Sequence, residues 1–361
     1  RKARFKTYAV QLILHLVFML LFIIVFSLIR PVSPMFDVQD ALLDHTSGEP
    51  SSGLRASWER AFYQISGDGE WWQWVETALM PSILSEEYEN GDSRRDSWNA
   101  RFANTVGIYN TQTAPVRFRQ VRVTNDSCDT PASGGDLTRP CWGEFSASHE
   151  FKGAFGAAYG NTYLTDLAQI CAQDGFGPCY GTGAYVVDLP LNRSGAFDVL
   201  REMKQDFWLN EQTRVVAIET SWYNANLDLS TYVRWQVDIS PGGRLQPSVV
   251  AHSCKLKPYA TTTDKLRAAV EVICVLTLLL SGVTLLYEVR VAKSAYFLHF
   301  WNWVDIAHLG IYTAVLFWWA AYVFKDKLPF EAVSSATNQG RPDLSRLAGH
   351  FDHTANLASF A

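Results

Sequence analysis

The sequence predicts a multi-pass membrane protein in which a large extracellular or lumenal α+β domain is inserted between the first and second transmembrane helices. Three observations lead to this prediction. Long apolar runs interrupt a chain of 361 residues whose formal net charge is only -5. The segment between the first two runs is mostly polar and contains most of the cysteines. Within that segment, helix-like and strand-like hydrophobic patterns occur together, as is typical of α+β folds.

The first apolar run spans Tyr8 to Ile29 and is long enough to cross a hydrocarbon layer of roughly 30 Å. A cleaved signal peptide would have a shorter apolar core and a small-residue cleavage site, and a buried helix of a soluble core is seldom this long. We therefore expect residues 1–30 to form a cytoplasmic basic flank and a retained transmembrane helix. Because the chain begins with Arg1, we also expect it to be an excerpt of a longer protein. The basic flank consists of Arg1, Lys2, Arg4 and Lys6.

Two further apolar runs, Ala268–Tyr287 and Phe297–Phe324, predict a second and a third transmembrane helix. Arg290 and Lys293 lie between them, which is typical of a cytoplasmic turn under the positive-inside rule. Trp318 and Trp319 fit an aromatic belt at the opposite interface. The expected boundaries are 31–265 for the outside domain, 266–290 for the second helix, 291–296 for the cytoplasmic loop, 297–324 for the third helix and 325–361 for the outside end.

Cysteine usage agrees with an oxidising compartment for residues 31–265. Cys128 and Cys141 enclose one short loop, and Cys171 and Cys179 enclose another, so both pairs are expected to staple their loops. Cys254 is then left over, either free or paired outside this sequence. No CxxC pair with a second ligand pair occurs, which argues against zinc.

Two N-glycosylation sequons fall in the same segment, Asn125-Asp126-Ser127 and Asn192-Arg193-Ser194. Such tripeptides are common by chance, and each one alone is a weak signal. Their shared position in the predicted outside domain agrees with that location.

Two stretches of the outside domain predict helices. Glu70 to Met80 is helix-like and is expected to stop at Pro81. Its tryptophans are expected to pack in a core or an interface rather than to form a ligand cage. Ala196 to Leu209 places its apolar side chains on one face, with Ser194 as the expected N-cap.

Three stretches predict strands. Tyr232 to Ile239 alternates apolar and polar side chains, which predicts a half-buried strand before a turn at Pro241. Val215 to Trp222 is expected to be its partner. Val116 to Thr124 predicts another strand, whose phase slips between Phe118 and Val121 as at a β-bulge.

Composition and motifs argue against several functions. The 36 acidic residues outnumber the 31 basic ones, whereas nucleic-acid binders normally carry a basic surplus. No HExxH, GxSxG or GxxxxGK[ST] motif occurs, and the short glycine loops lack the context of a dinucleotide site. We expect no enzyme, no catalytic residue, no bound metal and no cofactor.

Polar groups in the apolar runs are the stronger functional lead, because an intramembrane carboxylate is unfavourable without a role. Asn302 and Asp305 share one face of the third helix, and His308 extends that face. The functional interpretation is an inward face that pairs with a cation or a basic helix. The alternative is that Asp305 sits near the interface and is solvated there. Glu288, at the cytoplasmic end of the second helix, is open to either interpretation.

The stretch that begins at Phe207 reads FWLNEQTRVVAIETSWYNANLDLSTYVRWQVDI and resembles the signature of the polycystin family of TRP-type cation channels, in its polycystin-2 branch. Further stretches agree in the same order, from Arg119–Val123 through Tyr180–Tyr185 to Val289–Asp305. The resemblance therefore covers nearly the whole chain. The signature residues here are Trp208, Arg214, Tyr223, Asn224 and Asn226.

The resemblance implies a structural assignment for each part. The three apolar runs correspond to S1, S2 and S3 of a voltage-sensor-like domain, and residues 31–265 correspond to the polycystin (TOP) domain. The resemblance places a disulfide at Cys128 and Cys141 and a glycan at Asn125. Asp305 corresponds to the S3 acid that faces basic residues of S4. S4 to S6 and the pore are not in this sequence.

The resemblance also implies a function. We expect a subunit of a tetrameric, non-selective cation channel with calcium as a possible permeant ion, to which this part contributes the assembly lid and part of the sensor. The alternative is a non-conducting receptor or adhesion subunit like the polycystin-1 branch. Expected partners are further copies of the chain or a polycystin-1-like subunit, membrane lipid and extracellular glycoproteins. The expected location is the ciliary or plasma membrane, with the endoplasmic reticulum as an alternative.

Overall fold

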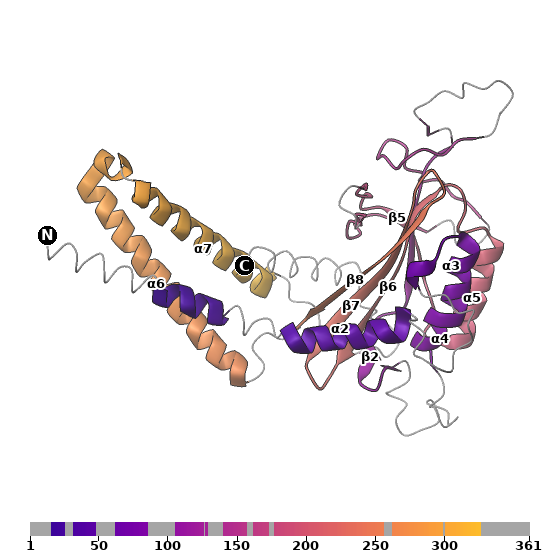
Figure 1. The fold of residues 1–361 in the computed structure, drawn as a ribbon, viewed down its shortest axis with the longest axis horizontal. Coiled ribbons are helices and arrows are strands. Elements are labelled where there is room, and N and C mark those ends of the chain that lie inside the picture. The colour runs from indigo at the N-terminus through magenta and orange to yellow at the C-terminus, as the bar shows by residue number, and fades with distance from the viewer. Residues whose placement is uncertain are drawn as a thin grey trace. The chain divides into compact units, whose positions relative to one another are not determined.

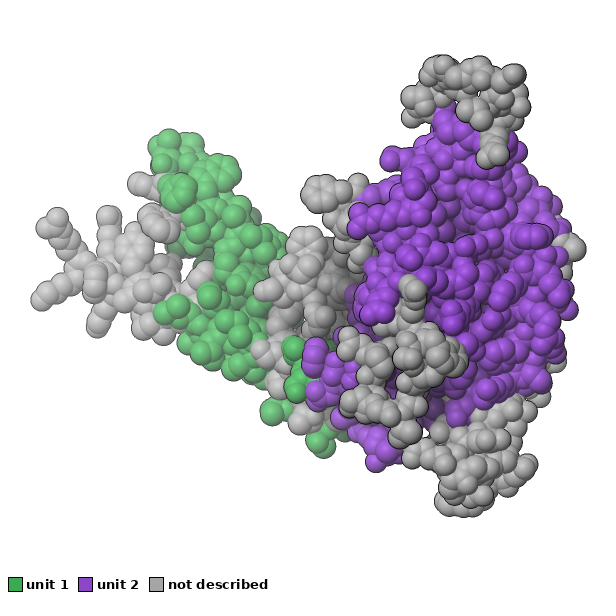
Figure 2. Space-filling model, turned by 45° about the vertical axis from the view of Figure 1, so that its right-hand side comes forward, with its two compact units in different colours: residues 1–35, 255–328, 353–361 green, residues 36–254, 329–352 purple. Residues whose placement is uncertain are grey.

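The computed structural model describes residues 16–25, 32–47, 62–85, 105–125, 127–128, 140–156, 162–172, 177–255, 262–298 and 300–325. The described residues form two compact units (Figure 2). The sheet unit lies between Phe36 and Cys254. The described residues of the helical unit are those up to Met35 and those from Lys255 to Lys325.

In its described residues, the sheet unit is built on eight antiparallel strands, with the long β6 in a central position (Figure 1). One side of β6 pairs with β3 and β2, and the other side pairs with β7, which in turn pairs with β8. The strands are β1 (Thr105–Val106), β2 (Asn110–Gln112), β3 (Arg117–Arg122), β4 (Tyr163–Leu164), β5 (Ala184–Asp188), β6 (Thr213–Asn224), β7 (Leu229–Ile239) and β8 (Leu245–Cys254).

Helices cover one face of this sheet (Figure 1). Phe118, Ile218 and Trp235 stand opposite one another on β3, β6 and β7, so their side chains share that face. The ring of Trp71 meets Phe118 at 6.0 Å between centroids, and Trp74 meets Trp235 at 6.5 Å. All of these side chains are buried, which confirms that the tryptophans after Glu70 pack in a core. The helices are α3 (Asp68–Trp74), η2 (Val75–Leu79), α4 (Met80–Ile83) and α5 (Arg193–Gln205).

The opposite face of the sheet is buried as well, so the prediction of a half-buried strand at Tyr232–Ile239 is wrong. Gln236 is fully buried and Asp238 is 8% exposed, although both belong to the polar side of the alternation. The reason is that chain segments from outside the sheet return over this face. The hydroxyl of Tyr180 donates to Oδ1 of Asp238 at 2.9 Å, and Nε2 of Gln236 donates to the carbonyl of Cys171 at 3.1 Å.

The other strand predictions agree with the structure. The segment Val215–Trp222 lies in β6 and pairs with β7, as expected. The irregularity expected in the strand from Val116 to Thr124 is present in β3, where the register with β6 shifts between Val121 and Arg122. The shift lies just beyond the predicted interval from Phe118 to Val121, so its predicted position is wrong by one residue step.

The helix predicted to stop at Pro81 continues to Ile83. A π-helical turn, η2, precedes α4, and the amide of Met80 donates to the carbonyl of Val75 within this wider turn. Pro81 then occupies the first turn of α4, where an amide donor is not needed. The chain therefore stays helical on both sides of the proline.

The expected N-cap at Ser194 is also wrong. Helix α5 begins at Arg193, so Ser194 lies inside its first turn and Asn192 takes the N-cap position. Asn192 makes no side-chain capping bond to the helix backbone; its Nδ2 donates instead to Oγ of Ser194 at 3.2 Å. At the other end, Phe207 takes a left-handed conformation with φ +51°, and the amide of Trp208 donates to the carbonyl of Met203. This is a Schellman ending without the usual glycine.

Helix α2 (Val32–Ser47) lies beside one end of the sheet (Figure 1). Its Gln39 donates from Nε2 to Oγ of Ser253 on β8 at 3.1 Å. This bond holds α2 against the last residues of the edge strand.

The helical unit contains a helix at Leu16–Val25, α6 (Thr262–Ala292), the 3-10 helix η4 (Lys293–Leu298) and α7 (Phe300–Lys325). Among the described residues, the stretch Asp264–Leu298 is the one helix found long and apolar enough to cross a membrane. Phe18, Cys274 and Tyr312 bring one residue from each of the three helices into a common apolar cluster. The remainder of the predicted first helix and the side chains of Trp318 and Trp319 lie outside the described residues.

Candidate functional site

The junction of α6 and α7 brings together the three residues expected to form a polar face. The carboxylates of Glu288 and Asp305 both act electrostatically on the hydroxyl of Tyr296, a buried side chain of η4. Asn302 donates from Nδ2 to the carbonyl of Tyr296 at 2.6 Å. Glu288 and Asp305 are themselves exposed in this chain. The Asn302 amide thus holds the turn, and the two exposed carboxylates lie beside it.

The indole of Trp303 supports the same turn. Trp303 donates from Nε1 to the carbonyl of Phe297 at 3.0 Å, beside the bond from Asn302 to Tyr296. Side chains at the start of α7 therefore satisfy two carbonyls of η4 that the short helix leaves open. These two bonds stabilise the turn that separates Glu288 from Asp305.

A row of alternating charges crosses the sheet unit and was not foreseen in the sequence. Asp188, Arg117, Glu219 and Arg234 stand directly opposite one another on β5, β3, β6 and β7. Arg117 binds Asp188 through two hydrogen bonds of 2.7 and 2.9 Å. Arg119 lies two residues after Arg117 on the same face of β3, and its Nη1 is 3.5 Å from Oε1 of Glu219. Opposite charges on facing strands stabilise their pairing, and a shift of register by one residue would separate every pair.

The central members of this row are buried. Arg119 and Glu219 are each 2% exposed, and Arg234 is 5% exposed. Burial lowers the pKa of the Arg119 guanidinium, while the negative charge of Glu219 opposes that shift. Removal of a buried carboxylate that lies between cations strongly destabilises the fold, because the buried positive charges are then left without an opposite charge.

Alkaline pH is expected to unfold the sheet unit. Burial, reinforced by Glu219, raises the pKa of Tyr232 well above its ordinary value of 10, and burial raises those of Tyr185 and Tyr223 to about 12. Because these pKa values are higher in the folded state, their contribution to stability is fully present below pH 10 and is lost as the pH rises toward 12. Circular dichroism and tyrosinate absorbance, recorded in one titration, check this. Between pH 10 and 12, the Tyr232→Phe variant should lose less stability than the wild type. Tyrosinate formation without loss of structure would contradict the prediction.

The signature residue Arg214 holds two loops together at the start of β6. Its Nε donates to the carbonyl of Gly143 at 2.7 Å, and its Nη2 donates to the carbonyl of Trp142 at 2.7 Å. Its Nη1 donates to the carbonyls of Glu211 and Thr213 at 3.0 and 2.7 Å. An arginine suits this position because one planar guanidinium presents several fixed donors.

The other signature residues also close the ends of the sheet. Trp208 is fully buried, and its carbonyl accepts from Nε2 of Gln120 at 2.6 Å. Asn224 accepts from the backbone of Asn226 at 3.1 Å, which shapes the turn between β6 and β7, and it donates to Asn110 of β2. Tyr223 donates to Asp228 across the same turn at 2.7 Å. The signature therefore specifies a scaffold rather than a binding pocket.

Both cysteine pairs expected to staple loops form disulfides in the structure, Cys128 with Cys141 and Cys171 with Cys179. Cys254 is free and 4% exposed, and burial raises the pKa of its thiol. In the part of the chain that the structure describes, no group of three or more His, Cys, Asp or Glu side chains could hold a metal ion.

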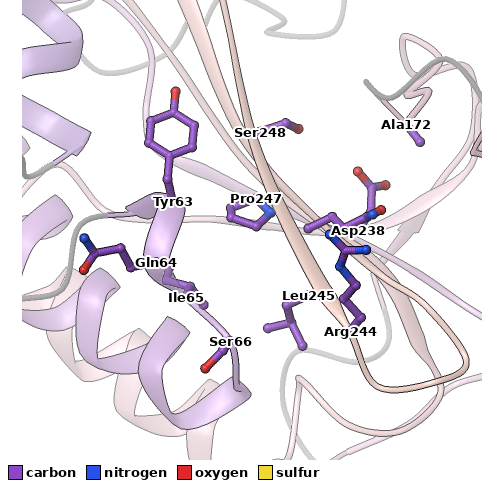
Figure 3. A pocket seen from close by; sticks show the side chains of 11 residues that line it. Tyr63, Gln64, Ile65, Ser66, Ala172, Asp238, Arg244, Leu245, Pro247 and Ser248 are labelled. Atoms are coloured by element: carbon purple, nitrogen blue, oxygen red, sulfur yellow. The ribbon is translucent and has the colours of Figure 1, made fainter.

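A hollow of about 610 Å³ opens along the start of β8 (Figure 3). One wall carries Tyr63 and Ile65 from η1 (Phe62–Gln64) and the residue after it, and the other carries Leu245 and Pro247. Asp238 and Arg244 contribute one charge of each sign. These mixed walls define no particular class of ligand.

The fold and these contacts define a disulfide-stapled α+β domain carried by apolar helices. A model of the polycystin domain matches residues 61–257, and the chain belongs to this family. Within the family it falls in the polycystin-2 branch.

Individual relatives support this placement. The chain is similar to Polycystin-2 of Danio rerio, with 26% identity over 87% of this chain and 34% of the relative. It is similar to Polycystin-2-like protein 2 of Homo sapiens, with 24% identity over 82% of this chain and 47% of the relative. Polycystin-1 of Homo sapiens is 25% identical over 51% of this chain and 4% of its own length. The chain thus spans less than half the length of these relatives.

Proposed function

We propose that this chain is part of a subunit of a polycystin-2-like tetrameric cation channel, non-selective and calcium-permeable. The sheet unit would act as the assembly lid, and the helical unit would supply S1 to S3 of a voltage-sensor-like domain. The observation that carries the proposal is a polycystin domain with an apolar helix on either side of it in the chain, Leu16–Val25 before it and α6 after it. Together with the polycystin-2 relatives, this order supports a lid between two membrane helices.

The native mass of the full-length protein in mild detergent tests the proposal. Four copies in one particle, followed by cation currents after reconstitution, are the expected result. A single copy, or one copy with a different partner and no current, would favour the second candidate, a non-conducting polycystin-1-like subunit. The similarity to Polycystin-1 over about half of the chain is the observation behind that candidate.

The topology that we propose places the sheet unit outside the cytoplasm, with the basic flank and η4 on the cytoplasmic side. The two disulfides support an oxidising compartment for the sheet unit. Asn125 and Asn192 are both exposed and are proposed as glycan acceptors. Further proposals are a ciliary or plasma membrane location, with the endoplasmic reticulum as the alternative, and contacts of the lid with extracellular glycoproteins.

Asp305→Asn is expected to shift the opening equilibrium of the full-length channel by about 1–3 kcal/mol. The reason is that Asp305 and Glu288 together place two negative charges beside a rigid turn, where a basic helix can be stabilised in one of two positions. Current–voltage relations of the wild type, Asp305→Asn and Glu288→Gln check the shift. The control is Asp198→Asn, an exposed acid of the sheet unit. Gating and surface expression identical to those of this control would remove the proposed role.

A further inference from the structure

The hydrogen bonds around Asn125 fix the direction of its side-chain amide. Nη2 of Arg122 can only donate, and it donates to Oε1 of Gln212 at 2.6 Å. Gln212 must therefore present its Nε2 on the other side, and this group donates to Oδ1 of Asn125 at 2.8 Å. Nε1 of Trp142 donates to the same oxygen at 3.2 Å. With Oδ1 engaged twice, Nδ2 is the amide atom left available for substitution.

A glycan on Nδ2 is compatible with this arrangement. Substitution of one Nδ2 hydrogen leaves Oδ1 as an acceptor, so the bonds from Gln212 and Trp142 are retained. Asn125 is exposed, so a sugar has room on its outer side. The folded sheet unit can therefore carry a glycan at this position.

The serine of the same sequon is closed off in the folded state. Ser127 is only 3% exposed, and its Oγ accepts from the amide of Gly143 at 2.9 Å. The two segments lie so close that a Cβ on Gly143 would stand 2.4 Å from the carbonyl oxygen of Ser127. The next residue, Cys128, is joined to Cys141. Arg214 fixes the carbonyls of Trp142 and Gly143 from the other side.

The sequon at Asn192 differs in each of these respects. Asn192 and Ser194 are both exposed, and their side chains bond to each other rather than to a distant segment. No disulfide adjoins this tripeptide, since the nearest bonded cysteine is Cys179. The two sequons therefore form an internal comparison within one chain.

We propose that folding closes the Asn125 sequon, so that glycosylation of Asn125 competes with formation of the Cys128–Cys141 disulfide. The donor is an oligosaccharide linked to a lipid pyrophosphate. In the transfer, a bond forms between Nδ2 and the sugar C1, the bond from C1 to the pyrophosphate oxygen breaks, the lipid pyrophosphate leaves and the amide releases one proton. The transferase must engage the Ser127 hydroxyl in an open chain, and the contact with Gly143 removes that hydroxyl from reach. The inference rests on the proposed outside location of the sheet unit.

Site-resolved occupancy in a cell-free translation with microsomes tests the competition. The lipid-linked donor is limited until Asn192 is partly occupied, and occupancy at both asparagines is measured by mass spectrometry of the full chain. In the wild type we expect Asn125 to be occupied less than Asn192. In the double variant Cys128→Ser/Cys141→Ser, the ratio of Asn125 to Asn192 occupancy should rise by about twofold or more, because disulfide closure takes seconds or longer and no longer occurs.

The matched control is Cys171→Ser/Cys179→Ser, which removes the other disulfide and leaves the Cys128–Cys141 disulfide intact. Its occupancy ratio should equal that of the wild type. An equal rise in both double variants would assign the effect to slower folding in general and would overturn the local competition. Modification of Asn192 with a ratio unchanged by Cys128→Ser/Cys141→Ser would overturn the inference alone. Modification of neither asparagine would overturn the outside location, and with it the inference.

Discussion

Replacement of Glu219 by alanine is expected to lower the free energy of unfolding of the sheet unit by about 3–5 kcal/mol. Glu219 stands between Arg117 and Arg234 in the register of the sheet, and its Oε1 is 3.5 Å from Nη1 of Arg119. Arg119 and Arg234 are almost completely buried. Without the carboxylate, both guanidinium groups would remain buried next to each other, and their desolvation would no longer be offset.

Glu76→Ala provides a control of the same chemical change. Glu76 pairs with Lys204 at 3.2 Å, but the two side chains are 32% and 48% exposed, so its loss should amount to about 0–1 kcal/mol. Urea-induced unfolding of the purified protein, followed by tryptophan fluorescence, measures both variants. Glu219→Gln should fall between them, because it keeps the shape and loses the charge. Equal effects of Glu219→Ala and Glu76→Ala would show that the buried row contributes no more than a surface pair.

The parts of the fold that sequence patterns predicted are those governed by neighbouring residues. The β6–β7 pair follows from an alternating stretch and a neighbouring strand-like stretch, and the two disulfides join cysteines that are close in the chain. The Trp71 cluster follows from helical spacing of large apolar side chains. In each case the information lies within one short, continuous stretch of the chain.

The burial of Gln236 and Asp238 could not be predicted in this way. It depends on Cys171 and Tyr180, which lie about 60 residues earlier in the chain. The charge row has the same origin, since Asp188, Arg117, Glu219 and Arg234 meet only after four strands take their register. A usable signal was present, because each of the three predicted strands contains at least one charged residue. Their pairing, however, required the strand order.

The predicted helix boundaries were wrong because they depend on local backbone geometry. The π-helical turn before Pro81 has no sequence signature of its own, and Ser194 and Asn192 are both acceptable N-cap residues. At the α6–α7 junction the sequence indicated that Asn302 and Asp305 share a face. It did not indicate that the Asn302 amide binds the carbonyl of Tyr296.

Arg214→Ala is expected to destabilise the sheet unit by about 3 kcal/mol or more, because hydrogen bonds from a charged donor are each worth about 1.5–3 kcal/mol and one side chain supplies four of them. Two of the acceptors, the carbonyls of Trp142 and Gly143, belong to the segment that closes over Ser127.

The loss should therefore be local as well as global. Limited proteolysis of Arg214→Ala is expected to cut first near Trp142, before the sheet unfolds, since Arg214 is what ties this segment to the start of β6. Arg214→Lys should recover only part of the stability, because one ammonium group cannot reach acceptors on both loops. The control is Arg201→Ala, a 67% exposed arginine whose loss should change stability by less than about 1 kcal/mol. If Arg214→Lys were as stable as the wild type, the positive charge would be the stabilising feature, and the several hydrogen-bond donors of the guanidinium would not.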